Sequence, residues 1–141
     1  MKKEILILKS TYYKEISQRL ESGSKECFNK YGISYDIIEV PGAMEIPVVL
    51  EKFKSKYKGF VIIGCIIRGE TSHYDVVKDT VVRSIYETVL KEQLSLGLSL
   101  LTVENYDQAL QRSSVEAKIN LGFRAAEVCL KMIKILNNEK F

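Results

Sequence analysis

The chain has 141 residues, of which 46% are hydrophobic and 28% charged, and its formal net charge is +3. This length predicts one domain over residues 1–141, large enough to bury a core. Lysine and arginine form no run or stripe, which argues against a nucleic-acid partner and against a basic membrane-binding patch, whereas the small positive excess suits an anionic small molecule.

Apolar runs alternate with helical patterns from end to end. In chain order we expect a strand at 5–8, a helix at 13–30, a strand at 35–40, a helix at 44–57, a strand at 60–67, a helix at 73–93, a strand at 96–103, a short helix at 105–112 and a long helix at 116–136. This alternation predicts an α/β protein with helices on both faces of a parallel sheet. Right-handed crossovers favour a flavodoxin-like three-layer αβα sandwich with a four-stranded parallel sheet in the order 2-1-3-4.

Spacings of three and four residues identify the helix faces that we expect to be buried. The first helix should turn Ile16, Leu20 and Cys27 inward. In the second helix, Pro47 falls in the first turn, where its missing N–H costs little. The last helix should bury the residues Leu121, Ala125, Val128, Met132 and Ile135.

The cysteines indicate a reducing environment. Cys27, Cys65 and Cys129 are odd in number and widely spaced, and one histidine is too few for the common zinc motifs. We therefore expect three buried free thiols and no metal. The N-terminal apolar run is too short for a signal sequence, and no segment approaches a membrane span, so a cytoplasmic location is expected.

Unusual residues follow the predicted strands at their carboxyl ends. These segments are residues 10–12, 40–43, 68–71 and 102–105. In an open parallel sheet the carboxyl ends of the strands meet at one edge, and ligands bind there. The sequence therefore predicts a binding site at this edge.

The single histidine, His73, lies where the third strand gives way to a helix. Ser72 and Asp75 have the spacing of a capping box, which predicts that the helix begins at His73. The positive end of a helix dipole disfavours imidazolium, so the ring can stay neutral and transfer a proton near pH 7. A lone histidine is more often a surface or core residue, and position alone leaves both interpretations open.

Four further features have a functional and an ordinary interpretation. The amides of the turn 69–71 can hold a phosphate, or the turn can be a plain loop. Glu45 can bind a ligand or simply complement a helix dipole, and Arg112 has the same alternatives at a helix C-terminus. Tyr12 can stack on a flat ring or pack at a helix start. Together they describe a site for a phosphorylated small molecule and a planar polar ring, with one proton shuttle and no metal.

Three motifs carry a resemblance to a known family. They are VPGAMEIP at 40–47, GCIIRGETSHYD at 64–75 and ENYDQALQR at 104–112. In this order they resemble the signatures of the 6,7-dimethyl-8-ribityllumazine synthases, and the likeness covers nearly the whole chain. The resemblance implies condensation of 5-amino-6-(D-ribitylamino)uracil with 3,4-dihydroxy-2-butanone 4-phosphate, the penultimate step of riboflavin biosynthesis, with release of phosphate and water and without a cofactor.

The resemblance also implies roles for individual residues. His73 matches the catalytic proton donor. The positions that match substrate-binding residues are Tyr12 for the pyrimidine face, Ala43, Met44 and Glu45 for the ribityl chain, Cys65, Ile66 and Ile67 for the pyrimidine edge, Glu70 and Thr71 for the phosphate, and Leu98 and Arg112, which should reach the site of a neighbouring subunit. Family sites lie between subunits, so a homo-oligomer is expected, as a pentamer or a multiple of pentamers.

Three departures from the family pattern stand out. Leu98 and Met44 occupy positions that are usually phenylalanine, and Leu121 falls where the family usually has a lysine, for which Lys118 is a possible substitute. Two other functions stay open at this point. One is an archaeal-type riboflavin synthase, against which the intact RGETSH motif argues, and the other is a non-catalytic shell protein that binds lumazine or flavin.

Overall fold

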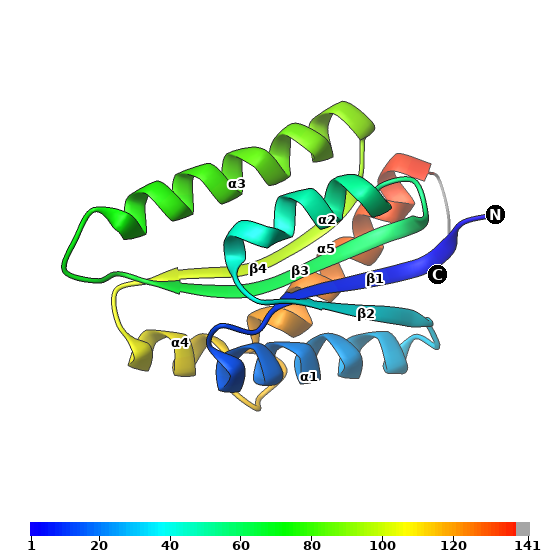
Figure 1. Cartoon of the computed structure of the whole chain (residues 1–141). Helices are drawn as coiled ribbons and strands as arrows, with labels where there is room; N and C mark the ends of the chain where they lie inside the picture. Colours follow the sequence, from blue (N-terminus) through cyan, green and yellow to red (C-terminus); the bar gives the residue numbers. More distant parts are fainter. Residues whose placement is uncertain (138–141) are drawn as a thin grey trace.

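The computed structural model describes residues 1–137, and residues 138–141 of the predicted domain lie outside this range. Within it, four parallel strands pair side by side in the order β2-β1-β3-β4 (Figure 1). The strands are β1 (Lys3–Ser10), β2 (Tyr35–Val40), β3 (Tyr57–Ile67) and β4 (Ser95–Val103). The predicted strand order 2-1-3-4 is confirmed.

Helices cover both faces of this sheet (Figure 1). One face carries α1 (Lys14–Lys30), α4 (Tyr106–Arg112) and α5 (Leu121–Asn137). The other carries the short 3-10 turn η1 (Ala43–Glu45), α2 (Ile46–Phe53) and α3 (His73–Glu92). The three-layer flavodoxin-like α/β fold is thus confirmed. None of the helices within residues 1–137 is long and apolar enough to span a membrane.

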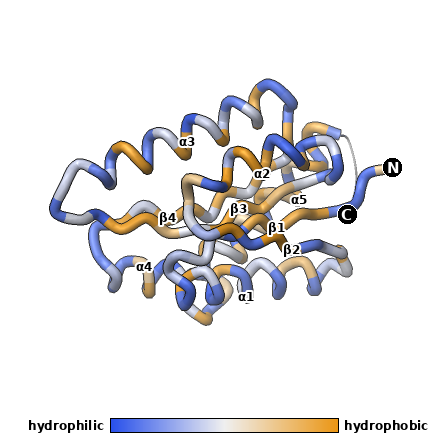
Figure 2. Tube along the Cα trace, viewed as in Figure 1, coloured by the Kyte–Doolittle hydropathy of each residue, from blue (hydrophilic) through white to orange (hydrophobic). Residues whose placement is uncertain are grey.

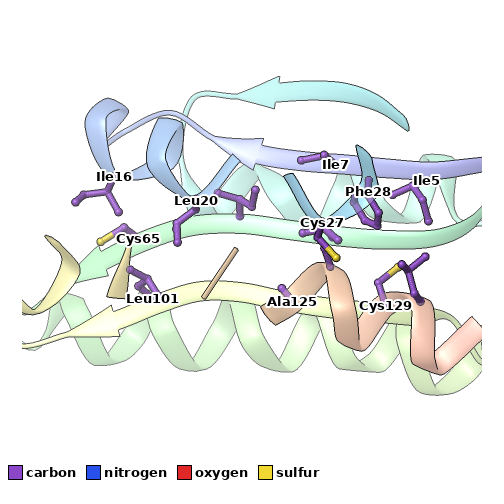
Figure 3. Close-up of a cluster of buried hydrophobic side chains, with 14 of the residues drawn as sticks. Ile5, Ile7, Ile16, Leu20, Cys27, Phe28, Cys65, Leu101, Ala125 and Cys129 are labelled. Carbon is purple, nitrogen blue, oxygen red and sulfur yellow. The ribbon is translucent and has the colours of Figure 1, made fainter. Parts of the chain in front are cut away.

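Two apolar cores lie on either side of the sheet because alternate strand residues point to opposite faces. On β1, Ile5 and Ile7 face α1 and α5, whereas Leu6 and Leu8 face α2 and α3. The central strand β3 therefore carries a continuous apolar run from Phe60 to Ile67, as expected for a strand covered on both sides (Figure 2). Figure 3 shows the first core between the sheet, α1 and α5.

All three cysteines are free and buried, as predicted. Burial raises the pKa of the Cys27 and Cys65 thiols to about 11 and that of Cys129 to about 12. Neutral thiols of this kind behave as small apolar side chains.

The second predicted helix was too long at both ends. Residues 43–45 form a 3-10 turn before α2 begins, and α2 ends at Phe53 rather than near Tyr57. Tyr57 instead opens β3, where it pairs with Lys3 of β1. The spacing of four between Phe53 and Tyr57 resembles a helical repeat, but these two rings meet across the α2–β3 loop with centroids 6.4 Å apart.

The last helix begins at Leu121 and not at residue 116, because Asn120 caps it. The side-chain oxygen of Asn120 accepts from the Phe123 N–H at 3.0 Å, and its amide donates to the carbonyls of Arg19 and Ser114 at 3.1 and 2.8 Å. A capping residue held in this way marks the boundary between loop and helix. Residues 114–120 therefore form a loop anchored to α1.

The predicted buried face of the last helix was partly wrong. Val128 and Ile135 are 49% and 62% exposed, whereas the buried residues of α5 are Gly122, Ala125, Ala126, Cys129, Leu130 and Ile133. Small side chains let α5 approach the sheet and α1 closely. A Cβ atom added to Gly97 of β4 would collide with the carbonyl oxygen of Ala125, and one added to Gly122 would collide with that of Leu20.

Buried charges join β1, β2 and α1. Lys9 pairs with Glu21 of α1, and the two side chains are only 4% and 6% exposed. Lys9 also pairs with Glu39 of β2 at 3.0 Å, and Glu21 pairs with Lys25 at 2.8 Å. Burial opposes the charged forms, but the hydrogen bonds outweigh it, so the pKa of Lys9 is raised and that of Glu21 is lowered.

We expect Gly97→Ala to lower the free energy of unfolding by about 2–3 kcal/mol, because the new methyl group must push α5 away from β4. Ser99→Ala is the matched control on the same strand face. Its buried hydroxyl has no hydrogen-bond partner among residues 1–137, so its removal should change stability by less than about 1 kcal/mol. Urea unfolding measures both. Equal losses in the two variants would contradict the close β4–α5 contact.

We expect Glu21→Gln to lower the free energy of unfolding by about 3 kcal/mol at pH 7, because it leaves buried Lys9 without its main counter-charge. The pKa of Glu21 is lowered in the folded state, so its stabilisation is complete above the ordinary value of 4.5 and is lost as the pH falls through the lowered value. The difference between the two proteins should therefore shrink in acid. Urea unfolding from pH 7 to pH 3 tests this, and a constant difference would refute the assignment.

Candidate active site

A cleft of about 340 Å³ opens at the carboxyl ends of β1 and β3. Its walls come from the loop after β1, the turn η1, the last residues of β3, and the loop and first turn that begin α3. The lining residues are Tyr12, Tyr13, Gly42, Ala43, Met44, Glu45, Cys65, Ile66, Ile67, Gly69, Thr71, His73, Tyr74 and Val77. The cleft is large enough for a small organic ligand and lies at the expected edge of the sheet.

Two tyrosines at the start of α1 form an aromatic wall. Tyr12 is 74% exposed, and its ring meets that of Tyr13 edge to face, with centroids 5.0 Å apart. Tyr13 packs against the core, and burial raises the pKa of its phenol. The two residues therefore differ in role: Tyr13 supports the wall, and the ring of Tyr12 is accessible to a flat ligand.

The segment 42–45 forms a second wall. Gly42 is extended and precedes the 3-10 turn, in which the Glu45 N–H donates to the Gly42 carbonyl at 3.3 Å. The Glu45 carboxylate curls back over Gly42, since a Cβ atom at Gly42 would lie 3.2 Å from Glu45 Oε1. Met44 is 50% exposed. An acceptor and a flexible apolar side chain thus stand side by side at the cleft.

The end of β3 forms the floor. Cys65 and Ile66 are 5% and 8% exposed, and Ile67 is half-buried. Because burial raises the pKa of Cys65 to about 11, its thiol is neutral near pH 7 and is a poor nucleophile. The side chains of the floor are therefore apolar or neutral.

The turn that leads into α3 carries the histidine. The helix begins at His73, as predicted, but the proposed capping box is wrong, because the Ser72 side chain makes no capping hydrogen bond. Thr71 serves instead: its Oγ1 accepts from the His73 N–H at 3.2 Å. Both Thr71 and His73 line the cleft, so the positive end of the α3 dipole lies beside it.

Three of the predicted site residues do not line this cleft. Glu70 is exposed in the turn between two lining residues. Leu98 is half-buried in the middle of β4 and packs against the core on the α3 side. Arg112 is exposed at the end of α4, where its Nη1 donates to the Gln108 carbonyl at 3.1 Å. The cleft of one chain is thus assembled without Leu98 and Arg112.

Sequence reasoning included the turn 69–71 but missed Tyr74 and Val77 as lining residues, and it gave Arg68 beside them no role of its own. Tyr74 and Val77 follow His73 by one and four residues, so the helical repeat could have identified both. Within residues 1–137 no group of three or more His, Cys, Asp or Glu residues is placed to hold a metal ion.

Fold and cleft together define a class of protein: a flavodoxin-like α/β protein with a cleft for a small molecule at the carboxyl edge of its sheet. Comparisons with known proteins narrow this class. The family model for 6,7-dimethyl-8-ribityllumazine synthase matches residues 2–137.

Individual relatives agree. The 6,7-dimethyl-8-ribityllumazine synthase of Bartonella bacilliformis is 44% identical over 135 residues, which cover 93% of this chain and 88% of the relative. That of Paramagnetospirillum magneticum is 38% identical over 141 residues, covering 94% and 93%. The chain therefore belongs to the 6,7-dimethyl-8-ribityllumazine synthase family, and its function is that of a lumazine synthase in riboflavin biosynthesis.

Proposed function

We propose that the cleft binds 5-amino-6-(D-ribitylamino)uracil and 3,4-dihydroxy-2-butanone 4-phosphate and joins them to 6,7-dimethyl-8-ribityllumazine, phosphate and water. The observation that carries this proposal is the meeting of an aromatic wall, a carboxylate and a helix N-terminus bearing the single imidazole around one cleft. These are the groups that a flat pyrimidine, a polyol chain and a phosphate require.

The pyrimidine substrate occupies the part of the cleft between Tyr12 and the end of β3. Tyr12 stacks on the ring, and the backbone groups of Cys65, Ile66 and Ile67 read its polar edge. The ribityl chain runs along the segment 43–45, where Ala43 and Met44 allow close approach and the Glu45 carboxylate accepts from its hydroxyls. This placement uses every wall of the cleft except the turn before α3.

The phosphate of the second substrate occupies that turn. The amides around Glu70 and Thr71 donate to its oxygens, and the positive end of the α3 dipole favours its charge. Arg112 of a neighbouring subunit supplies a guanidinium, which suits phosphate because it donates two parallel hydrogen bonds. Leu98 of the same neighbour forms an aliphatic wall against the pyrimidine.

His73 moves protons in the reaction. The 5-amino group of the uracil attacks the ketone, and loss of water gives an imine. Elimination of phosphate leaves an enol that becomes a second ketone. The ribitylamino nitrogen attacks this carbonyl, and loss of a second water completes the ring. Because neutral imidazole can accept and return a proton, His73 serves these steps, while orientation of the two substrates supplies most of the acceleration.

The site requires a neighbour, so we propose a homo-oligomer, a pentamer or a multiple of pentamers. Leu98 and Arg112 do not line the cleft of their own chain, which agrees with a role in the cleft of another. Cyclic symmetry would repeat one such shared site at every interface.

We expect His73→Ala to lower kcat by about ten- to a hundredfold and to change either KM little, because the substrates stay oriented while proton transfer falls to water. Ser72→Ala is the matched control in the same turn, since its side chain makes no capping hydrogen bond. Product fluorescence measures both rates against the spontaneous reaction. Unchanged turnover in His73→Ala at saturating substrates would reject the proton-transfer role.

Mixing two inactive variants tests the shared site. Thr71→Asp places a carboxylate where the phosphate binds, and Arg112→Ala removes the neighbour's guanidinium. If each cleft takes Thr71 from one chain and Arg112 from another, co-assembly of equal amounts should restore activity in about a quarter of the sites. Sedimentation should show an assembly of at least five chains. No recovery in co-assembled mixtures, or a monomer at micromolar concentration, would refute the shared site.

A further inference from the structure

Arg68, the first residue after β3, makes more interactions than any residue predicted for the site. Its Nε donates to both carboxylate oxygens of Glu104, at 2.8 and 3.1 Å, in the loop after β4. Its Nη1 lies 3.5 Å from Asp75 Oδ2 in the first turn of α3. One guanidinium therefore joins the ends of two strands to the start of a helix.

An aromatic contact strengthens this arrangement. The Arg68 guanidinium lies 4.5 Å from the centroid of the Tyr74 ring, and Tyr74 is buried. The Lys78 Nζ lies 5.1 Å from the centroid of the same ring, and it pairs with Asp75 Oδ1 at 3.6 Å. Isolated exposed ion pairs stabilise little. Here, however, the Nε of Arg68 is shared between both oxygens of Glu104 while the guanidinium lies over the Tyr74 ring, and the two contacts together restrict its orientation.

These contacts bracket the turn 69–72. Arg68 lies directly before it, and its partners Tyr74 and Asp75 lie directly after it. The turn itself is exposed, and a Cβ atom at Gly69 would meet nothing within 4 Å. Its local hydrogen bonds run from the His73 N–H to Thr71 Oγ1 and from the Val76 N–H to the Ser72 carbonyl at 3.2 Å, and the Arg68 N–H before it donates to the Val103 carbonyl at 2.9 Å. The Arg68 side chain therefore ties the residue before the turn to the residues that follow it.

We infer that Arg68 is a positioning residue for binding of the sugar phosphate: it holds the turn 69–72 in the conformation that presents its amides to the phosphate. This inference rests on the proposed function. Arg68 acts through the turn and does not contact the phosphate. Two carboxylates, Glu104 and Asp75, already occupy its guanidinium and offset its charge.

The test compares Arg68→Gln, Arg68→Lys, Glu104→Gln and the double variant Arg68→Gln/Glu104→Gln. Arg83→Gln is the matched control, an exposed arginine further along α3. We expect Arg68→Gln to raise KM for the sugar phosphate about tenfold and Glu104→Gln about threefold, while KM for the pyrimidine changes less than twofold. Arg68→Lys should not rescue, because an ammonium lacks the planar fork.

The double variant separates positioning from direct contact. If Arg68 works through Glu104, the double variant should be no worse than Arg68→Gln alone. If Arg68 instead touched the phosphate, Glu104→Gln would free its charge and lower KM for the sugar phosphate. That result, full rescue by lysine, or an equal rise in both KM values would overturn the inference.

Binding of inorganic phosphate gives a second readout that needs no turnover. Calorimetry on the assembled protein should show phosphate binding weakened by Arg68→Gln and unchanged by Arg83→Gln. A wild-type protein that makes no lumazine above the spontaneous rate, yet shows this pattern, would reject the proposed function and keep the inference. If the protein makes lumazine but Arg68→Gln and Arg83→Gln bind phosphate equally well, the inference about Arg68 is overturned and the proposed function stands.

Discussion

Parallel pairing of β3 with β1 and β4 is the constraint on which the site depends. β3 is the longest strand, and its neighbours pair with it in register, so that Leu8 lies opposite Ile62 and Ile62 opposite Leu98. Because all the strands point the same way, the chain leaves each of them at one edge. The aromatic wall, the segment 42–45 with Glu45, and His73 therefore meet at this edge, and no long loop is needed to bring them together.

Much of this arrangement could be predicted because the signals are local. A strand buried on both faces is a continuous apolar run, as at 60–67, and parallel strands separated by helices allow few topologies. Tyr12, Glu45 and His73 were identified because each directly follows a strand or opens a helix, and the structure brings them to one cleft. A local signal does not show which residues of another subunit lie beside the cleft. The placement of Leu98 and Arg112 in a partner's site therefore stays a prediction.

The features that sequence reasoning missed depend on contacts between distant residues. Arg68 and Glu104 are 36 positions apart, and nothing near either residue indicates the pair. Asn120 ends a loop only because Arg19 and Ser114 accept from its amide. The buried face of α5 was misjudged for a related reason. The predicted face rightly included Ala125, but its large residues Val128 and Ile135 are exposed, whereas the small residues Ala126 and Cys129 fill the close contact with the sheet and α1.

The departures from the family pattern fall where the fold tolerates them. Asn120 and Gly122 have fixed roles, one as the α5 cap and the other as the close contact with Leu20 of α1. Leu121 between them is half-buried and packs against the core shared by α1 and α5, so leucine adds apolar packing where a lysine would need to keep its ammonium in water. Met44 is half-exposed at the cleft and bears no part of the core. Leu121 therefore serves packing, whereas Met44 is a side chain that lines the cleft.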